Sequence, residues 1–191
     1  MTLTNDIAKY LYEIGQLKRV KRSGWWMVGI TDPESVAEHS FRVAILGYIL
    51  ASLEGADPLK VAAMCLFHDT PETRINDPHQ LAKRYVQVKE GEKLAEDEQL
   101  ERLPPSISQS IASLFHDYEE RESLESVIAH DADALECLIQ AREYQVQGYA
   151  EVQDWIDNCY AALKTASAKK LAEASLHVEP QEWWQELKKR V

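Results

Sequence analysis

Apolar residues recur at helical spacing along almost the whole chain, and this feature restricts the possible folds most. Only 7 glycines and 7 prolines interrupt the 191 residues, and no stretch of any length alternates apolar and polar residues as a half-buried strand would. The pattern therefore predicts an all-α protein. Hydrophobic residues make up 45% of the chain, enough to bury a core. We expect one compact multi-helix domain over residues 1–191, with a helical extension from about 165 to 191.

Turn and capping signals divide this pattern into separate helices. Asp57-Pro58 is typical of an N-cap followed by proline at the first helical position, and Pro104-Pro105 indicates a second helix start. The stretch GWWMVGITDPES is rich in turn-forming residues. The predicted helices cover about 5–18, 34–53, 58–69, 79–102, 105–117, 122–147, 150–165 and 167–175, and a short one around 180–189.

Charge and cysteine content narrow the class of protein. A net charge of −11 argues against wrapping a nucleic-acid backbone, but it allows a small anionic ligand held by local cations or a metal. Cys65, Cys137 and Cys159 lie far apart in apolar stretches, so we expect buried, reduced thiols. The N-terminal segment is amphipathic, and no apolar run approaches the roughly 18 residues of a membrane span. We expect a cytoplasmic protein that binds neither a nucleic-acid polymer nor a membrane.

Candidate metal ligands occur in three segments that the pattern makes helical. ESVAEHSFRVA contains His39, LFHDTPE contains His68 and Asp69, and IAHDADALECL contains Asp131 and Asp133. A lone histidine on an apolar helix face is more often a satisfied core residue. Here, however, a histidine and a carboxylate end an apolar run, where burial without partners is costly. A divalent cation with two imidazole and two carboxylate ligands would offset that cost and keep positions open for water and substrate.

A further carboxylate follows the first His-Asp pair. Glu72 comes four residues after His68, so it points the same way if the helical turn persists past Pro71. It could then act as a general base on a water; the alternative is a solvated carboxylate at a helix end. The tetrapeptide LFHD occurs again at residues 114–117, where no further ligand pairs with it. We predict that His116-Asp117 closes a helix as a partly solvated cap.

The order of these residues resembles that of a known family. His39, His68-Asp69 and an Asp in ADALE, with LKRVKRSGWW upstream, are similar to the HD-domain metal-dependent phosphohydrolases. Within them the resemblance is to the bacterial 5'-deoxynucleotidases and their eukaryotic relatives. It implies an all-helical HD fold, a homodimer, and hydrolysis of deoxyribonucleoside 5'-monophosphates to a deoxynucleoside and phosphate. It also implies one divalent ion, with Co, Mn, Mg, Fe and Zn not distinguished, bound by His39, His68, Asp69 and Asp133.

The same resemblance implies roles around that ion. Glu72 would activate the water, and Asp77 would lie near the sugar 3'-hydroxyl. Arg22 and Trp25 would line the phosphate and nucleotide pocket, and Lys83 is a further candidate for a phosphate contact. Trp25 is equally plausible as a core residue.

Two positions are open from the residues alone. Periodicity favours Asp131 as the fourth ligand, because it shares a face with Leu135 and Leu138, whereas the family pattern favours Asp133. Relatives often have a glycine just before the position of Asp77, where this chain has Asn76. Asparagine tolerates positive φ, so we expect the turn to be kept.

Alternative functions share parts of this pattern. The same centre could remove phosphate from a nucleoside di- or triphosphate or from a modified nucleotide. A dinuclear HD oxygenase or cyclic-dinucleotide phosphodiesterase would need more histidine ligands, and His79 and His116 are the candidates before His130. A non-catalytic regulatory module with a decayed site is the remaining alternative, although every expected ligand and Glu72 are present.

Overall fold

The computed structural model describes residues 3–188 and confirms the all-α prediction. Among these residues, extended segments pair only in an isolated bridge between Lys21 and Ser35. The α-helices and 3₁₀ helices (η) are α1 (Leu3–Ile14), η1 (Gly15–Lys18), η2 (Ser23–Val28), α2 (Val36–Glu54), α3 (Pro58–Phe67), α4 (Glu72–Ile75), α5 (Gln80–Lys83), α6 (Val88–Leu100), α7 (Pro105–Glu120), α8 (Leu124–Val146), η3 (Ala150–Val152), α9 (Gln153–Ala162), α10 (Ala166–His177) and α11 (Glu182–Lys188).

Side-chain caps fix the starts of the main helices. Ser35 and Glu38 form a capping box at the start of α2. The Asp57 carboxylate accepts from the backbone N–H groups of Leu59 and Lys60, and Pro58 follows as the first residue of α3. The helix start predicted from Asp57-Pro58 is therefore confirmed.

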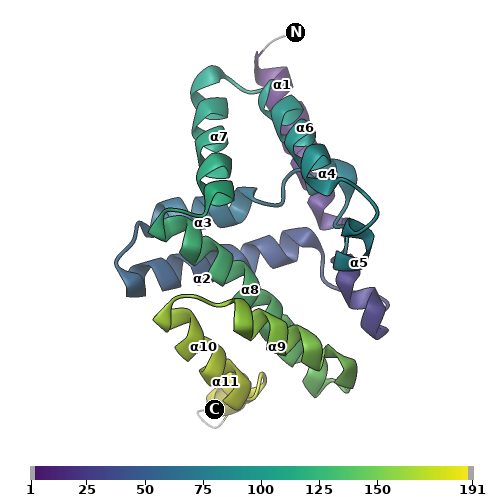
Figure 1. Cartoon of the computed structure of the whole chain (residues 1–191), viewed down its shortest axis with the longest axis vertical. Helices are drawn as coiled ribbons and strands as arrows, with labels where there is room; N and C mark the ends of the chain where they lie inside the picture. Colours follow the sequence, from purple (N-terminus) through teal and green to yellow (C-terminus); the bar gives the residue numbers. More distant parts are fainter. Residues whose placement is uncertain (1–2, 189–191) are drawn as a thin grey trace.

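Helices α2, α3 and α8 form the centre of the molecule, and α9 and α10 cover α8 below them (Figure 1). The core between them includes Leu50, Val61, Leu135 and Leu138, all with no exposed surface. α2 and α3 approach closely at Gly47, where an added Cβ would lie 2.8 Å from the Cys65 sulfur. This close approach brings the end of α3 to the start of α2, where the histidines stand.

A second, smaller cluster of buried side chains lies among α1, α6 and α7, the helices in the upper part of Figure 1. Tyr10 of α1, Leu100 of α6, and Ile111 and Phe115 of α7 are buried against one another there. This cluster holds α6 and α7 on one side of the segment 68–83, which carries several of the predicted site residues.

Several helix boundaries differ from the predictions. The continuous helix expected at 79–102 is wrong: α5 ends at Lys83, and α6 begins at Val88. The helix expected to end at 117 continues to Glu120 and ends at Arg121, which has φ 57°. The first helix is shorter, because its last turn is the 3₁₀ segment η1.

Helix α2 also qualifies the expectation about membranes. By length and composition, Val36–Glu54 could cross a bilayer, but half of it is buried inside the protein. It carries the fully buried His39, and Arg42 on the same helix pairs with carboxylates of α8. These features are those of a core helix.

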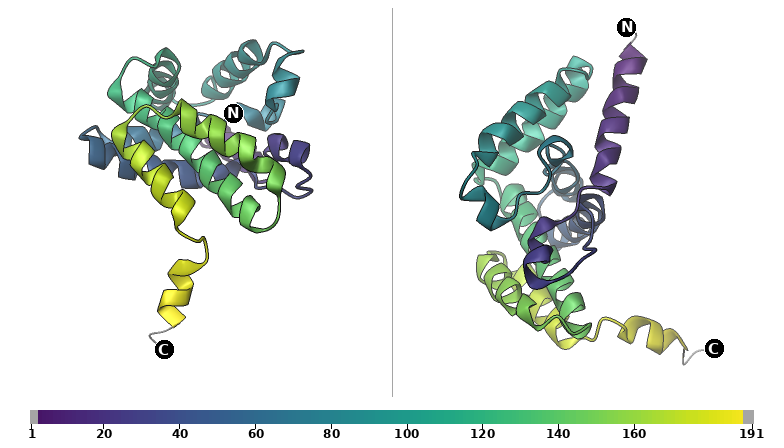
Figure 2. Two further views of the ribbon diagram at one scale, coloured as in Figure 1. Left: turned by 60° about the horizontal axis from the view of Figure 1, so that its bottom comes forward. Right: turned by 90° about the vertical axis from the view of Figure 1, so that its right-hand side faces the viewer.

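The last helix stands away from the body. Figure 2 shows α11 extending beyond α10, and every residue from 181 to 188 is exposed. By contrast, α10 belongs to the core, because Ala168 and Ala172 are fully buried against it. The extension predicted at 165–191 therefore consists of a packed helix and a projecting one, and residues 189–191 lie outside the described part.

Candidate metal centre and active site

His39 is held from both sides of its imidazole ring. It lies in the first turns of α2, just after the capping box, and is fully buried. Its Nδ1 lies 2.5 Å from Oε2 of Glu136, and its Nε2 lies 3.0 Å from Oδ1 of Asp133. Because a carboxylate can only accept, the contact with Glu136 places the proton on Nδ1 and leaves Nε2 to face Asp133.

His68 is oriented in the same way at the end of α3. Its Nδ1 lies 2.9 Å from the Cys65 carbonyl oxygen, which accepts the Nδ1 proton, and its Nε2 lies 3.2 Å from Oδ2 of Asp69. The same Asp69 oxygen is 3.8 Å from Nε2 of His39. His39, His68 and Asp69 thus form a group whose free ligand atoms converge and could hold a metal ion.

Unsatisfied polar atoms mark this point as a cation site. Nε2 of His39, Nε2 of His68, Oδ2 of Asp69 and Oε2 of Glu72 are buried and make no hydrogen bond of acceptable geometry, although Nε2 of His39 lies close to Asp133 and Nε2 of His68 lies close to Asp69. Buried polar atoms are rarely left without a partner. Ligand atoms about 2.1 Å from one ion lie about 3–4 Å apart. The distances from Nε2 of His39 to Asp133 (3.0 Å) and to Asp69 (3.8 Å), and from Nε2 of His68 to Asp69 (3.2 Å), lie in this range. The residues present therefore fit a divalent cation.

The two candidate aspartates of α8 have different environments. Both oxygens of Asp131 are used: they accept from the backbone of Lys164 (2.8 Å) and of Thr165 (2.7 Å), and from the Thr165 hydroxyl (2.7 Å). Thr165 is the N-cap of α10, so Asp131 ties α8 to the start of that helix. Asp133 faces His39 and keeps 34% of its side chain exposed toward the cavity. The geometry thus places Asp133, rather than Asp131, beside the histidines.

Glu72 opens the short helix α4 directly after the His-Asp pair. Its backbone N–H donates to the Asp69 carbonyl, so the helical turn continues past Pro71. Glu72 is 4% exposed and lines the same cavity as Asp69, so it is not a solvated carboxylate at a helix end. Burial, and then the negative charges of Asp69 and Asp77, raise the pKa of Glu72 to about 11. A nearby cation would oppose this shift and favour the carboxylate.

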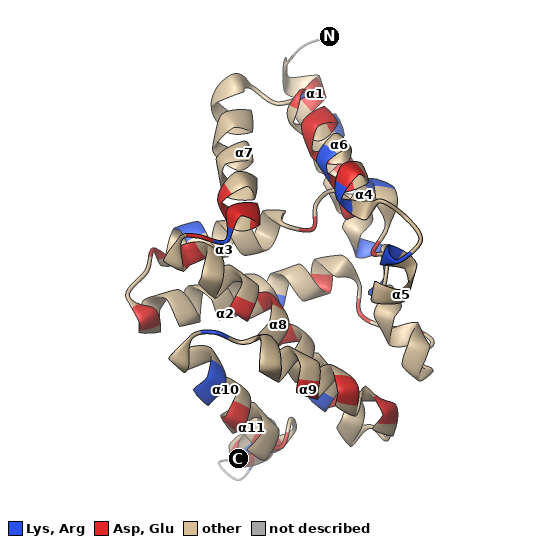
Figure 3. Ribbon diagram, viewed as in Figure 1, with Lys and Arg blue, Asp and Glu red and all other residues tan. Residues whose placement is uncertain are grey.

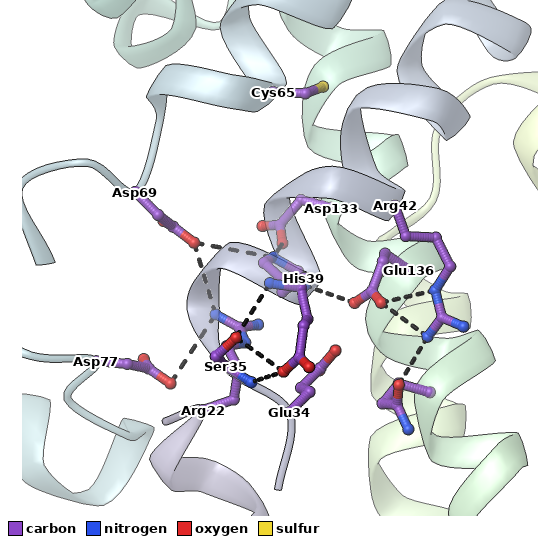
Figure 4. A network of polar contacts seen from close by, with 12 residues as sticks. Arg22, Glu34, Ser35, His39, Arg42, Cys65, Asp69, Asp77, Asp133 and Glu136 are labelled. Carbon is purple, nitrogen blue, oxygen red and sulfur yellow. Dashed lines mark hydrogen bonds and ion pairs between the residues drawn. The ribbon is translucent and has the colours of Figure 1, made fainter. Parts of the chain in front are cut away.

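Arg22 lies among the carboxylates on the other side of the site (Figure 4). Its Nη1 is 3.8 Å from Asp69 and 4.0 Å from Asp77. Although burial opposes the charge, Asp77, Asp69 and Asp133 raise the pKa of Arg22 well above its usual value. Arg22 is therefore a permanent cation at the cavity wall.

The loop that carries Asp77 is anchored to η2. The Ser23 backbone N–H donates to Oδ2 of Asp77 (3.0 Å), and the Ser23 hydroxyl donates to the Asp77 carbonyl. Asn76 has φ 62°, which confirms the positive φ expected where relatives often have glycine. These contacts direct the Asp77 carboxylate toward Arg22 and the cavity.

The other two candidates for substrate contacts have contrasting positions. Trp25 is 2% exposed and packs against Tyr144 and Trp155, with Nε1 donating to Glu34 (3.2 Å). It serves as a core residue whose edge reaches the cavity wall. Lys83 is exposed at the cavity rim, at the end of α5.

These residues surround one cavity of about 1050 Å³. Figure 3 shows Asp and Glu spread over most helices with Lys and Arg interspersed, and the cations that line the cavity include Arg22 and Lys83. Burial works against ionisation of Asp69, but His68 and Arg22 lower its pKa to about 2. Burial and Arg22 oppose a charge on His39, yet Glu136 and Asp133 raise its pKa to about 10. In the absence of a metal, the carboxylates of the site and the His39 ring thus stabilise one another's charged forms.

His79 and His116, the candidate ligands of a second metal ion in a dinuclear site, do not lie beside His39 and His68 as ligands. His116 is 77% exposed on α7, and its neighbour Asp117 pairs with Lys60 (2.6 Å). His116-Asp117 therefore lies within the last turns of α7 and does not cap it. The ring of His79 accepts from the Ala82 backbone and caps α5.

The sequence analysis missed three groups around the site. The fully buried Glu136 and the partly exposed Arg42 form a network behind His39, and Tyr118 lies between the rings of His68 and His130 at the cavity wall. Glu136 could have been found from the sequence. Asp133, Glu136, Gln140 and Glu143 follow one another at spacings of three and four, which places them on one face of a helix.

Comparison with known proteins agrees with this geometry. The model of the HD domain matches residues 14–175. The chain belongs to the HD-domain family. This confirms the resemblance found in the sequence. This chain is 32% identical to the 5'-deoxynucleotidase HDDC2 of Dictyostelium discoideum over 142 residues, which cover 70% of this chain and 74% of the relative.

A human relative and a solved structure extend the comparison. The human 5'-deoxynucleotidase HDDC2 is 27% identical, with 80% of this chain and 76% of that one covered. The crystal structure of a protein from Pyrococcus horikoshii OT3 matches this HD domain with a TM-score of 0.78 and 25% identity, over 90% of this chain and 99% of that one. The similarity therefore includes most of the helices that build the site.

Proposed function

We propose that this HD domain is a metal-dependent phosphohydrolase that removes the 5'-phosphate from deoxyribonucleoside 5'-monophosphates. The observation that carries the proposal is the convergence of unsatisfied histidine and aspartate atoms beside Glu72 and Arg22 in one cavity. The relatives named 5'-deoxynucleotidase support the choice of substrate class. A cavity of this size accommodates a nucleotide.

Each residue has a chemical role in this proposal. His39, His68, Asp69 and Asp133 would hold one divalent ion, either Co, Mn, Mg, Fe or Zn. When bound, such an ion would lower the pKa of a water molecule and supply positive charge for the attacked phosphate. Glu72 removes the proton of the attacking water, and Arg22 binds phosphate oxygens. Asp77 contacts the sugar hydroxyl, Lys83 assists at the phosphate, and the edge of Trp25 borders the nucleotide.

The cavity rim carries several cations that could contact phosphate oxygens. Lys83 and Arg121 line the cavity, as do Lys89, which also contacts Glu119, and Lys93, which also contacts Glu96 and Asp97. The choice of a monophosphate therefore rests on the relatives named 5'-deoxynucleotidase. The direct test measures phosphate release from a panel of nucleoside mono-, di- and triphosphates with Mn²⁺ or Co²⁺. Release from deoxynucleoside monophosphates supports the proposal, and its absence from all of them would exclude it.

Substitution of Glu72 tests the proposed base. Glu72→Ala should lower kcat by about 10²–10⁴-fold, because the proton acceptor is lost. Metal content, measured by elemental analysis, should stay at one ion per chain. Turnover that persists in this variant would show that another group is the base.

The proposal includes a homodimer in the cytoplasm. A row of exposed apolar side chains along α2 supports an interface between two copies; it comprises Phe41, Ile45, Tyr48, Ile49 and Leu53. Light scattering after size-exclusion chromatography measures the mass in solution, and a monomer at micromolar concentration would contradict the dimer.

A further inference from the structure

Two carboxylates from the same face of α8 contact the two ring nitrogens of His39. Asp133 and Glu136 stand three positions apart on α8, so they present their carboxylates on the same side of that helix. Asp133 meets Nε2 of His39, and Glu136 meets Nδ1. The imidazole therefore has one nitrogen directed at the metal position and the other fixed by a fully buried carboxylate.

Arg42 fixes Glu136 in turn (Figure 4). It lies one turn after His39 on α2, and its Nε and Nη2 atoms both lie 2.8 Å from Oε1 of Glu136. The remaining guanidinium contacts go outward along α8, to Gln140 and Glu143, each at 2.8 Å. Oε1 of Glu136 thus accepts from Arg42, while Oε2 accepts from His39.

We propose that Glu136, held by Arg42, is a positioning residue that fixes the tautomer and ring orientation of His39, so that Nε2 is available to the metal. This inference rests on the proposed function, because it requires His39 to be a ligand. The physical reason is general: a ligating histidine needs its second nitrogen protonated and held, and a carboxylate acceptor also makes the imidazole a stronger ligand. Arg42 supplies the charge that makes burial of the Glu136 carboxylate tolerable.

An isosteric change separates this role from simple packing. In Glu136→Gln the amide has one acceptor oxygen where the carboxylate has two, so either Arg42 or His39 faces an NH₂ group. We expect the affinity for Co²⁺ to fall by about ten- to a hundredfold, with an altered visible spectrum of the bound Co²⁺. The matched control is Glu143→Gln, which removes a carboxylate contact of Arg42 but touches neither Glu136 nor His39; its affinity should stay within about twofold of the unchanged protein.

A double variant gives a positive test. In Arg42→Met with Glu136→Gln, the amide oxygen is free to accept from Nδ1–H, because no guanidinium competes for it. Part of the lost affinity should return relative to Glu136→Gln alone. Should Glu136→Gln fail to fold by circular dichroism, Arg42→Gln carries the test, with a smaller loss expected in the same direction.

The outcomes distinguish the two proposals. Absence of Co²⁺ binding in the unchanged protein would overturn the metal-dependent function itself. Normal binding there, together with unchanged affinity and spectrum in Glu136→Gln, would overturn the positioning role alone. Loss of affinity in Glu136→Gln with restoration in the double variant supports it.

Discussion

Asp131 and Asp133 are separated by one residue but have different roles: Asp131 accepts hydrogen bonds at the start of α10, and Asp133 faces His39. Substituting each one tests these roles. Asp131→Asn removes a buried charge that accepts three hydrogen bonds at the start of α10, so it should lower the free energy of unfolding by about 1.5–3 kcal/mol. Asp133→Asn should instead abolish tight metal binding. Thermal unfolding of the metal-free proteins and Mn²⁺ titration of both variants measure the two effects; loss of metal in Asp131→Asn with little change in stability would reverse the assignment.

Metal binding should depend strongly on pH. His39 has its pKa raised to about 10 in the metal-free site, and that of Glu72 is raised to about 11, so both hold protons at neutral pH. A cation must displace the proton of each ligand that it binds and disfavours the one on Glu72. The affinity should therefore rise with pH between 6 and 8, by up to about tenfold per pH unit for each proton released. Calorimetry in buffers of different ionisation enthalpy counts the protons, and a Kd independent of pH would contradict the expectation.

The residues of the site differed in how far the sequence could specify them. The His-Asp pair ends an apolar helix and has a carboxylate four residues on, so its placement beside Glu72 followed from spacing. The choice between Asp131 and Asp133 did not, because the two side chains point to different sides of α8 and periodicity favoured Asp131, which faces the apolar side. What separates them is the backbone of Lys164 and Thr165, more than thirty residues away, which uses Asp131. The spacing of apolar residues along one helix cannot indicate a hydrogen-bond partner from such a distant part of the chain.

At the scale of elements, the turn between α4 and α5 carries strain that substitution can relieve. Asn76 has φ 62° and ψ −178°, a region used almost only by glycine, and such a residue costs about 1–3 kcal/mol. Asn76→Gly removes this strain, but it also lowers stability by about 0.4–1 kcal/mol, because glycine gives the unfolded chain more conformational freedom. The net effect should be a gain in stability, measured by urea unfolding. Asn76→Ala should be destabilising, and a stabilised alanine variant would show that the conformation is not strained.

The broken helix at 79–102 shows where local patterns fail. No glycine or proline lies between Lys83 and Val88, so nothing in the sequence indicates an end there. The exposed Tyr85 and Val86 occupy the break, and α6 beyond it packs on α4 and α7. Tertiary packing of α6 overrides local propensity here. By contrast, the starts of α2, α3 and α7 were predictable, because capping side chains or prolines act within a few residues of their own position.

At the scale of the whole molecule, α10 belongs to the packed core, whereas α11 does not contribute to it. Ala168 and Ala172 of α10 are fully buried against the core, whereas every residue from 181 to 188 is exposed. A chain ending after Pro180 should therefore keep its stability within about 1 kcal/mol, because none of the residues 181–188 that it loses is buried. A chain ending after Thr165 should not fold, since the core around α8 would be uncovered.

The same truncation also tests how copies associate. The apolar row of α2 lies outside the removed segment, so a dimer formed through it should survive in the chain ending after Pro180, with a mass in solution of twice that of the shortened chain and with unchanged turnover. Trp183, Trp184 and Leu187 are the exposed apolar residues of α11. Conversion to a monomer with intact helical content would mean that these three side chains form the contact between copies. A dimer that persists after truncation, but is lost in Phe41→Ser with Ile49→Ser, would place the contact on α2.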